Sequence, residues 1–149
     1  MFDRFTHHDH SDHPLANVSL FRACSRAELD AIVSVTTLID VPAGRVLCTE
    51  GVGGDEFFVI VEGEAAVSVN HVQVATLGPG DFFGEMALLD GGPRVATVTA
   101  TSDSRMLVLT RPEFNGLLER APTVCHRILV GLGHRLRAAT QPAATPIGT

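Results

Sequence analysis

Residues 80–100, GDFFGEMALLDGGPRVATVTA, contain the side chains best suited to chemistry. Gly84 and Glu85 begin a short predicted helix, whose first backbone N–H groups have no partner within the helix and can bind an anion. Arg94 follows a Gly-Gly-Pro turn that can fold the chain back over this helix, and its planar, permanently charged guanidinium suits a phosphate. Glu85 beside an anion makes sense if the same ligand donates a hydroxyl group, such as a ribose 2′-hydroxyl. This combination predicts a site for a nucleotide monophosphate.

Short strands are the elements that must position this stretch. Runs rich in β-branched and aromatic residues fill residues 36–109 and alternate with turns that contain Gly, Pro or Asn. Many short strands about 8–12 residues apart are typical of an all-β sandwich or barrel. The segment 84–90 interrupts them as one short helical turn. We expect φ above zero at the turn glycines Gly44, Gly51, Gly63 and Gly80, because a residue without Cβ adopts that conformation cheaply.

Helical patterns flank the strands on both sides. Ser25 and Glu28 form a capping-box pattern, which predicts a helix over residues 26–35. After residues 111–112 the pattern predicts a helix that ends near Arg120, and Pro122 suits the first turn of a second one. The second helix carries an apolar stripe made of Cys125, Ile128, Leu129, Leu132 and Leu136. Cations that complement the helix dipole occupy its last turns, at His134, Arg135 and Arg137.

Length and composition limit the classes of protein to which the chain can belong. Its 149 residues indicate a single domain, and a formal net charge of −6 disfavours direct binding to DNA or RNA. The sequence has neither an apolar run of the roughly 18 residues that a membrane span needs nor the apolar stretch of a signal peptide, so we expect a cytoplasmic protein. Three separated cysteines, Cys24, Cys48 and Cys125, predict ordinary thiols in place of a disulfide framework or zinc site.

The chain divides into a polar tail, a folded domain and a second tail. We expect residues 1–14 to be flexible, residues 15–140 to form the domain, and residues 141–149 to be flexible again. The first tail is a solvated leader or, alternatively, a site for a transition metal, since imidazole is a common ligand of such ions and the tail contains His7, His8, His10 and His13.

The stretch FGEMALL…GGPRVATVTA, residues 83–100, resembles the phosphate-binding cassette of cyclic-nucleotide-binding domains, as in catabolite-activator-type regulators and protein kinase A regulatory subunits. We call these residues the cassette. The resemblance extends to LFRACSRAELDAI, EGVGGDEFFVIVEGEAAV and LGPGDFFGE, and it covers roughly residues 15–140. It implies a mainly β fold with flanking helices: a double-stranded β-helix (jelly-roll) barrel with an N-terminal helix, a short cassette helix and C-terminal helices.

The family resemblance also implies roles for individual residues. Arg94 would pair with the exocyclic phosphate oxygens of a cyclic nucleotide, and Glu85 would accept the ribose 2′-hydroxyl. Gly84 would allow the ligand to approach closely, and Val74 would pack against the base. Backbone N–H groups would complete the phosphate cradle, from Met86, Ala87 and Val95. An alternative assigns Arg94 and Glu85 to a salt bridge that closes a barrel corner.

The residue after the cassette arginine predicts cAMP over cGMP as the ligand. Family members that favour cGMP tend to have Thr there, whose hydroxyl reaches the guanine, whereas protein kinase A-like sites have Ala; this chain has Val95. The C-terminal helix has no aromatic residue to cover the base. The stretch HRLRAATQ resembles the catabolite-activator helix that reaches the adenine, which makes Thr140 a candidate base contact, and a frayed helix end the alternative.

The expected mechanism is a switch without covalent chemistry, and thus not an enzyme. Cyclic nucleotide orders the cassette helix, and the two C-terminal helices repack to regulate an unknown protein partner or an appended effector, either as a stand-alone sensor or as a fragment of a longer protein. The resemblance to the family favours a homodimer formed through the C-terminal helix. Two alternatives are a non-binding scaffold module with a decayed pocket and a cupin-type metal enzyme, which needs about three inward His or carboxylate ligands.

Overall fold

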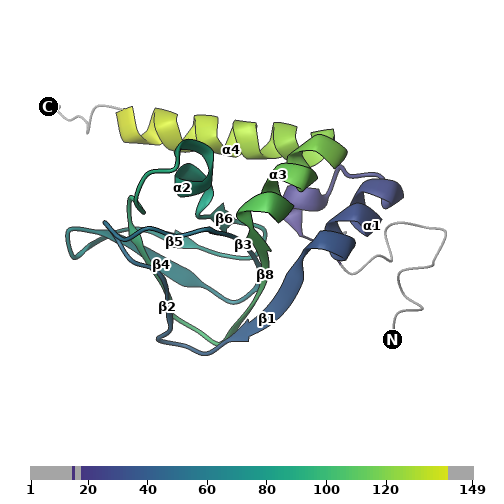
Figure 1. Ribbon diagram of the computed structural model, residues 1–149. Coiled ribbons are helices and arrows are strands. Elements are labelled where there is room, and N and C mark those ends of the chain that lie inside the picture. The colour runs from purple at the N-terminus through teal and green to yellow at the C-terminus, as the bar shows by residue number, and fades with distance from the viewer. Residues whose placement is uncertain (1–14, 16–17, 141–149) are drawn as a thin grey trace, which may run out of the picture.

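Two four-stranded antiparallel sheets face each other and helices cover one side of them, as Figure 1 shows for the computed structural model. The structure describes Leu15 and residues 18–140. The predictions for the two tails, including the histidines of the first, lie outside these described residues. The double-stranded jelly-roll fold predicted from the sequence is confirmed by this pair of sheets.

The order of the strands in each sheet is that of a chain wound back and forth between the two sheets. The first sheet has the order β1 (Thr37–Val41), β8 (Ser104–Thr110), β3 (Glu56–Glu62) and β6 (Phe82–Phe83). The second has the order β2 (Val46–Cys48), β7 (Thr97–Ala100), β4 (Ala65–Val69) and β5 (Val72–Leu77). Strand β6 was not predicted, because two residues are too few to show a period. It joins the first sheet by pairing with β3 directly before the cassette helix.

Turn chemistry sets the registers of these strands. Asn70 and His71 have φ of 53° and 67° between paired residues Val69 and Val72, which makes a two-residue hairpin with a left-handed loop. The predicted positive φ is confirmed at all four turn glycines, with values of 93°, 82°, 99° and 89° in sequence order. At Gly63 a Cβ atom would lie 2.1 Å from the Ser104 hydroxyl oxygen, so this turn also requires the absence of a side chain.

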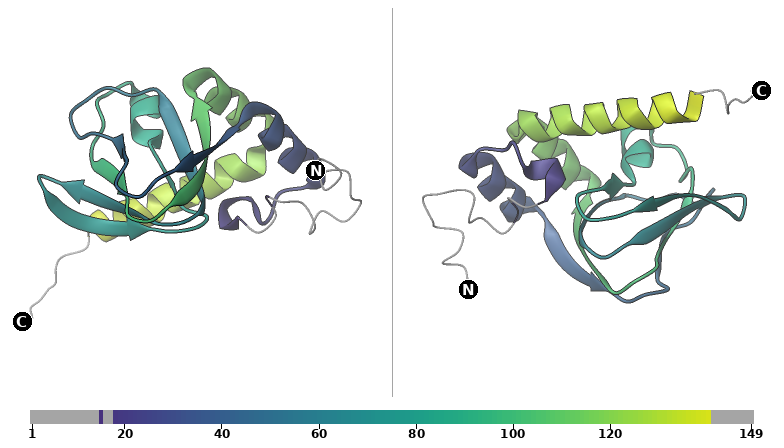
Figure 2. Two further views of the ribbon diagram at one scale, coloured as in Figure 1. Left: turned by 90° about the horizontal axis from the view of Figure 1, so that it is seen from below. Right: turned by 180° about the vertical axis from the view of Figure 1, so that it is seen from behind.

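The helices gather on one side of the two sheets, and α4 passes over α2 in both Figure 1 and the right-hand view of Figure 2. They are η3 (Ser19–Phe21), α1 (Arg26–Val35), α2 (Glu85–Asp90), α3 (Arg111–Arg120) and α4 (Pro122–Thr140). The predicted capping box at Ser25 is confirmed, and Thr110 with Glu113 forms a second one at the start of α3. No helix in the described part of the chain combines the length and hydropathy that crossing a membrane requires.

The predicted apolar stripe on α4 is only partly buried. Ile128 packs into the core, together with Val124, which the stripe did not include. Leu129 and Leu136 are 60% and 66% exposed. The stripe therefore presents apolar side chains to solvent in both halves of α4.

Two hydrophobic clusters share the first sheet as a common wall. On β3, Phe57 and Val59 pack against the helices, whereas Phe58 and Ile60 point between the sheets, as the two-residue period of a strand requires. We call the first cluster the helical-layer core. The second, the barrel core, consists of Val41, Cys48, Phe58, Ile60, Ala65, Phe83, Val98, Ala100 and Met106.

The cysteines are free thiols in this fold. Cys24 and Cys48 are buried and Cys125 is partly exposed. Burial raises the pKa of the Cys24 thiol to about 11, and the neighbouring Glu28 carboxylate adds to this shift. Burial likewise raises the pKa of Cys48 to about 11. Both thiols are therefore protonated at neutral pH and are poor nucleophiles.

Glu28 joins the first helix to the last. One carboxylate oxygen accepts from the Ser25 backbone N–H at 2.9 Å and from the Thr123 hydroxyl at 3.0 Å, and the other accepts from the Thr123 backbone N–H at 3.1 Å. Partial burial raises the pKa of Glu28, but the hydrogen bonds from Ser25 and Thr123 outweigh it and leave the pKa below its ordinary value. The carboxylate thus caps α1 and holds the beginning of α4 in place.

Stability should therefore depend on the charge of Glu28. Because its pKa is lower in the folded state, its contribution is complete above the unfolded-state pKa and is lost as the pH falls through the folded-state pKa. We expect Glu28→Gln to lower the free energy of unfolding by about 1 kcal/mol at pH 7, and by less under acid conditions. Urea unfolding between neutral and acid pH measures this. The exposed carboxylate of Glu119 on α3 supplies the control Glu119→Gln, and equal pH dependence in both variants would contradict the assignment.

Candidate functional site

Arg94 folds back onto the start of the cassette helix. Its Nη1 donates to the Gly84 carbonyl oxygen at 3.1 Å and its Nη2 to the Glu56 carbonyl oxygen at 2.9 Å. The side chain is buried, with 7% of the residue exposed. A guanidinium has more N–H donors than these two acceptors use, so it keeps donors for an anion. The predicted reversal of the chain thus brings a fixed positive charge to residue 84, where α2 begins.

The loop before β3 leaves room for this guanidinium. A Cβ atom on Gly54 would lie 2.3 Å from Arg94 Nε, so this position accommodates the arginine because it has no side chain. The same loop holds the Arg94 backbone, since Arg94 N–H donates to the Val52 carbonyl at 2.9 Å and Gly51 N–H donates to the Arg94 carbonyl at 2.8 Å. The glycine-rich segment 51–54, which the sequence marked as a turn, positions the arginine from both sides.

Glu85 lies at the first position of α2 and is buried, with 4% of the residue exposed. Its partner is Arg135 of α4, whose Nη1 lies 3.2 and 3.3 Å from the two carboxylate oxygens. Arg135 also donates to the Phe82 carbonyl oxygen, and its guanidinium carbon lies 4.3 Å from the centre of the Phe82 ring. The sequence had indicated only that Arg135 complements a helix dipole, because its partners lie about fifty residues earlier in the chain.

Arg94 and Glu85 do not pair with each other among the residues that the structure describes. Glu85 pairs with Arg135, and Arg94 donates to backbone carbonyls. The alternative in which the two residues close a barrel corner as a salt bridge is therefore wrong. Each is held separately at the same end of α2.

Gly84 is required by its backbone conformation and its surroundings. It is the N-cap of α2 with φ of 94°, a conformation that L-residues with a Cβ atom rarely adopt. A Cβ atom here would lie 2.6 Å from the Glu56 carbonyl oxygen and 2.9 Å from Arg94 Nη1. The glycine thus allows β3, the start of α2 and the arginine to meet at one point.

Arg111 is a contact of the cassette that the sequence did not reveal. From the first position of α3 its Nη1 donates to the Leu88 carbonyl at 2.7 Å, and its Nη2 donates to Asp55 at 3.2 Å. A cation at the last carbonyls of a helix complements the helix dipole. Arg111 therefore ties the end of α2 to α3, and Asp55 is its ion-pair partner.

The other predicted ligand contacts lie on α2, β5 and α4 and in the loop after α2. Met86 is exposed and Ala87 is buried in the first turn of α2, where backbone N–H groups lack acceptors within the helix. Val95 follows Arg94 and is 60% exposed, and Val74 is exposed on the edge strand β5. Thr140 is the last residue of α4, and its side chain lies outside the described part of the structure. The ligand contacts of these residues stay predictions.

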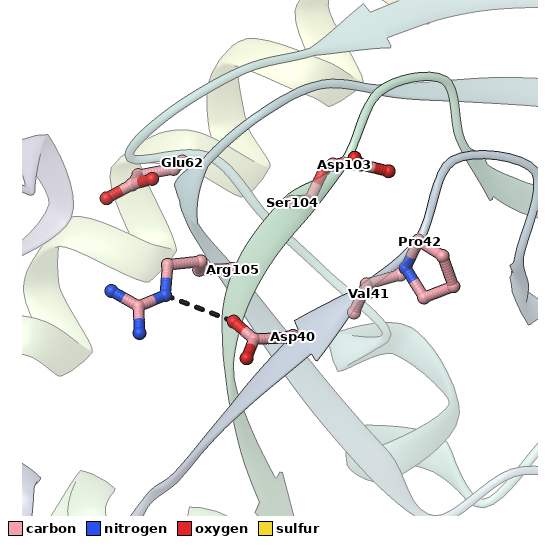
Figure 3. Close-up of a pocket in the computed structure, with 7 residues that line it drawn as sticks. All are labelled: Asp40, Val41, Pro42, Glu62, Asp103, Ser104 and Arg105. Carbon is pink, nitrogen blue, oxygen red and sulfur yellow. Dashed lines mark hydrogen bonds and ion pairs between the residues drawn. The ribbon is translucent and has the colours of Figure 1, made fainter.

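A hollow at the rim of the barrel opposite the cassette has a mainly acidic lining. It has a volume of about 390 Å³ and is lined by residues 40–42, Glu62 and residues 103–105 (Figure 3). Three of these side chains are carboxylates, and the one cation among them, Arg105, pairs with Asp40 at 3.1 Å. Such a lining repels a phosphate, so the cassette remains the candidate anion site.

A metal centre of the cupin type finds no ligand set in the region covered by residues 15 and 18–140. Nowhere in it do three His, Cys, Asp or Glu side chains gather so that they could hold a metal ion. At the cassette the structure provides a buried guanidinium, Arg94, with N–H donors to spare, and a buried carboxylate, Glu85, which can accept hydrogen bonds.

Comparisons with known proteins identify relatives of this chain. The chain is 41% identical over 114 residues to a cyclic nucleotide-gated potassium channel of Rhizobium etli, covering 76% of this chain and 32% of the channel. It is 33% identical over 125 residues to the cyclic AMP receptor protein of Thermus thermophilus, covering 80% and 58% of the two chains. The chain thus spans about a third of one relative and less than two thirds of the other.

A solved structure extends the similarity over nearly the whole chain. The CBD2 domain of a protein kinase A regulatory subunit with bound Sp-2Cl-cAMPS superposes with a TM-score of 0.74 at 25% identity, covering 95% of both chains. Residues 38–121 match the model of the family described as the cyclic nucleotide-binding domain. These residues include all of β1 except Thr37, the cassette and all of α3. The chain therefore belongs to the cyclic nucleotide-binding domain family.

Proposed function

We propose that this chain is a cAMP sensor, in which residues 15–140 form the domain and non-covalent binding at the cassette repositions α3 and α4. One observation carries the proposal: two buried side chains of opposite charge, Arg94 and Glu85, are held at the same end of α2 by separate partners. An anion with an adjacent hydroxyl donor matches such a pair. A cyclic phosphate fused to a ribose has both groups.

Each group of the ligand has a proposed partner. Arg94 uses its remaining N–H donors on the exocyclic phosphate oxygens, aided by the backbone N–H groups of Met86, Ala87 and Val95. Glu85 accepts the ribose 2′-hydroxyl. Val74 packs against the base, and Thr140 contacts it from the end of α4. The six-residue α2 contributes little dipole of its own, so the guanidinium supplies most of the positive charge.

A switch follows from the contacts of the cassette. The cassette helix is tied to α3 by Arg111 and to α4 by Arg135, so a ligand that moves α2 acts on both. The ligand shifts this equilibrium only as far as its affinities for the two states differ. The repositioned helices would act on a protein partner or on an effector in a longer chain, since the relatives extend beyond the matched region.

A homodimer through α4 is part of this proposal. Leu129 and Leu136 are two turns apart on one face of the helix, and both are largely exposed. A second copy of α4 would cover them. Light scattering with and without cAMP measures the mass of the assembly in each state.

The decisive test is a calorimetric titration of the purified chain with cAMP and, separately, with cGMP. The proposal expects saturable binding with the tighter affinity for cAMP. Two comparisons support the choice of cAMP: one relative is a cyclic AMP receptor protein, and the solved domain has bound the analogue Sp-2Cl-cAMPS. Absence of binding by either nucleotide would overturn the proposed function.

Val95 offers a test of the preference between the two nucleotides. Its exposed side chain has no hydroxyl group for the 2-amino group of guanine. We expect Val95→Thr to strengthen cGMP binding by about 3- to 10-fold, the worth of one hydrogen bond, and to leave cAMP binding within about twofold. Parallel titrations of both ligands measure this. Val95→Ala is the control, because it shortens the side chain without adding a hydroxyl group.

The scaffold alternative is favoured by one observation. Arg94 and Glu85 both have partners within the protein, the Glu56 carbonyl oxygen and Arg135, and a module that binds no ligand would need no others. Thermal unfolding distinguishes the two functions. A ligand that binds only the native state, at a concentration 100 times its dissociation constant, raises the free energy of unfolding by about 2.7 kcal/mol. A scaffold would unfold at the same temperature with and without cAMP.

A further inference from the structure

Strand β5, which carries Val74, is an edge strand of the second sheet. Among the strands that the structure describes, it pairs with β4 alone. Its register with β4 skips one residue, because Gln73 and Ala75 lie opposite adjacent residues of β4 and Val74 has none opposite it. Such a β-bulge bends the strand and changes the direction of a side chain. The direction of Val74 therefore depends on how the β4–β5 hairpin is held.

One side chain attaches the tip of this hairpin to the loop after β2. The Asn70 backbone N–H donates to Glu50 Oε1 at 2.9 Å. Asn70 directly follows the last paired residue of β4, Val69, so its N–H group has no acceptor within the ladder. The Glu50 carboxylate supplies that acceptor. The hairpin is thus fixed at its tip as well as along β4.

The backbone of Glu50 contacts the end of the cassette. Its N–H donates to the Thr97 hydroxyl oxygen at 3.0 Å, in a contact that is partly buried. The next two residues, 51 and 52, bind the Arg94 backbone through two further hydrogen bonds. Glu50 therefore connects the segment that holds the arginine with the hairpin that carries Val74.

We infer that Glu50 is a positioning residue of the nucleotide site, which sets the place of Val74 against the base. This role rests on the proposed function and deepens it, because it adds a determinant of base recognition outside the cassette. Arg94 fixes the phosphate end of the ligand, and the hairpin meets the base at the other end. A hairpin attached to the loop of the arginine keeps these two ends at a constant separation.

The bond between Glu50 and Asn70 should matter more for binding than for the fold. Asn70 is exposed, and the loss of a contact at the surface changes the free energy of unfolding only slightly. Replacement of the Glu50 side chain removes this bond and leaves the backbone bond to Thr97 in place. The two contacts of Glu50 can therefore be tested separately.

The first experiment compares cAMP with ribose 3′,5′-cyclic phosphate, which has no base, on the wild-type chain and on Glu50→Ala. We expect the variant to bind cAMP about 3- to 10-fold more weakly, the worth of one hydrogen bond. It should bind the base-free compound within about twofold of the wild type. Equal weakening of both ligands would show that Glu50 acts through Arg94 or through the fold as a whole, and would overturn the inference.

Two further variants control for the charge of the side chain. Glu50→Gln keeps an oxygen that can accept from the Asn70 N–H, so its affinity for cAMP should stay within about twofold of the wild type. Glu64→Ala removes an exposed carboxylate just before β4, at the other end of the hairpin, and should leave the affinity unchanged. Equal losses in Glu64→Ala and Glu50→Ala would assign the effect to net charge and contradict the inference.

A double-mutant cycle tests whether Glu50 acts through Val74. Val74→Ala shortens the side chain that packs against the base in the proposed function. With this change in place, Glu50→Ala should weaken cAMP binding by less than twofold further, whereas two independent effects would multiply. Multiplication of the two losses would show that Glu50 does not act on Val74.

The outcomes separate this inference from the proposed function. A wild-type chain that binds neither cAMP nor cGMP overturns both. A wild-type chain that binds cAMP, with Glu50→Ala equal to it in affinity for cAMP and for the base-free compound, overturns this inference and leaves the proposed function intact.

Discussion

Replacement of Arg94 with alanine is expected to weaken cAMP binding by roughly 100-fold or more. Each charge-assisted hydrogen bond to a phosphate contributes about 1.5–3 kcal/mol, and the guanidinium can form two of them in parallel. Arg94→Lys should lie between the wild type and Arg94→Ala, because it keeps the charge and loses the fork. Calorimetric titration of the three chains gives the order of affinities.

The Arg94→Ala variant is expected to remain folded. Arg94 belongs to neither hydrophobic cluster, and its removal leaves two carbonyl oxygens, of Gly84 and Glu56, for water to reach. Circular dichroism and thermal unfolding check that the variant is folded. Glu85→Ala should act in the same direction with a smaller loss, since it removes one hydroxyl contact. Folded variants with wild-type affinity would refute the assignment of these two residues.

Gly84→Ala is expected to have the largest effect of any single methyl group added to the cassette. The left-handed backbone costs roughly 1–2 kcal/mol with a Cβ atom, and overpacking in a close-packed site adds about 1–3 kcal/mol. The atom that it meets is the backbone oxygen of Glu56 at 2.6 Å, which also accepts from Arg94. Relief of the clash therefore moves the arginine, so cAMP binding should fall by about 100-fold along with stability.

Gly91 provides the matched control at the other end of α2. It also has a left-handed backbone, with φ of 72°, but a Cβ there meets nothing within 4 Å. Gly91→Ala should therefore cost only the backbone term of roughly 1–2 kcal/mol and leave the affinity nearly unchanged. Urea unfolding and titration of both variants measure the difference. Equal losses in the two would show that the contact with Glu56 is unimportant.

The elements of the fold could be predicted largely because their determinants are local in sequence. The Ser25–Glu28 capping box placed the start of α1, and the positive-φ glycines marked turns. Pro122 marked the first turn of α4. Each of these signals acts within four residues, and such local interactions leave a recognisable pattern of residue types.

The contacts of the candidate site that the sequence missed all join distant segments. Arg135 reaches Glu85 fifty positions earlier, and Arg111 reaches Leu88 across 23 positions. No local rule distinguishes these arginines from others that complement a helix dipole. Exposure of Leu129 was missed for the same reason, since the stripe on α4 shows which face is apolar and not which part of it another element covers.

Strand β3 supplies alternate side chains to the helical-layer core and to the barrel core, so both clusters fix its length. Replacement of one residue perturbs a single cluster. Insertion of one residue, by contrast, would turn Phe57 and Val59 toward the side where Phe58 and Ile60 now lie, and would disorganise both clusters at once. We therefore expect β3 to tolerate a change of residue type better than a change of length, and the exposed tip of the β4–β5 hairpin at residues 70–71 to accept extra residues.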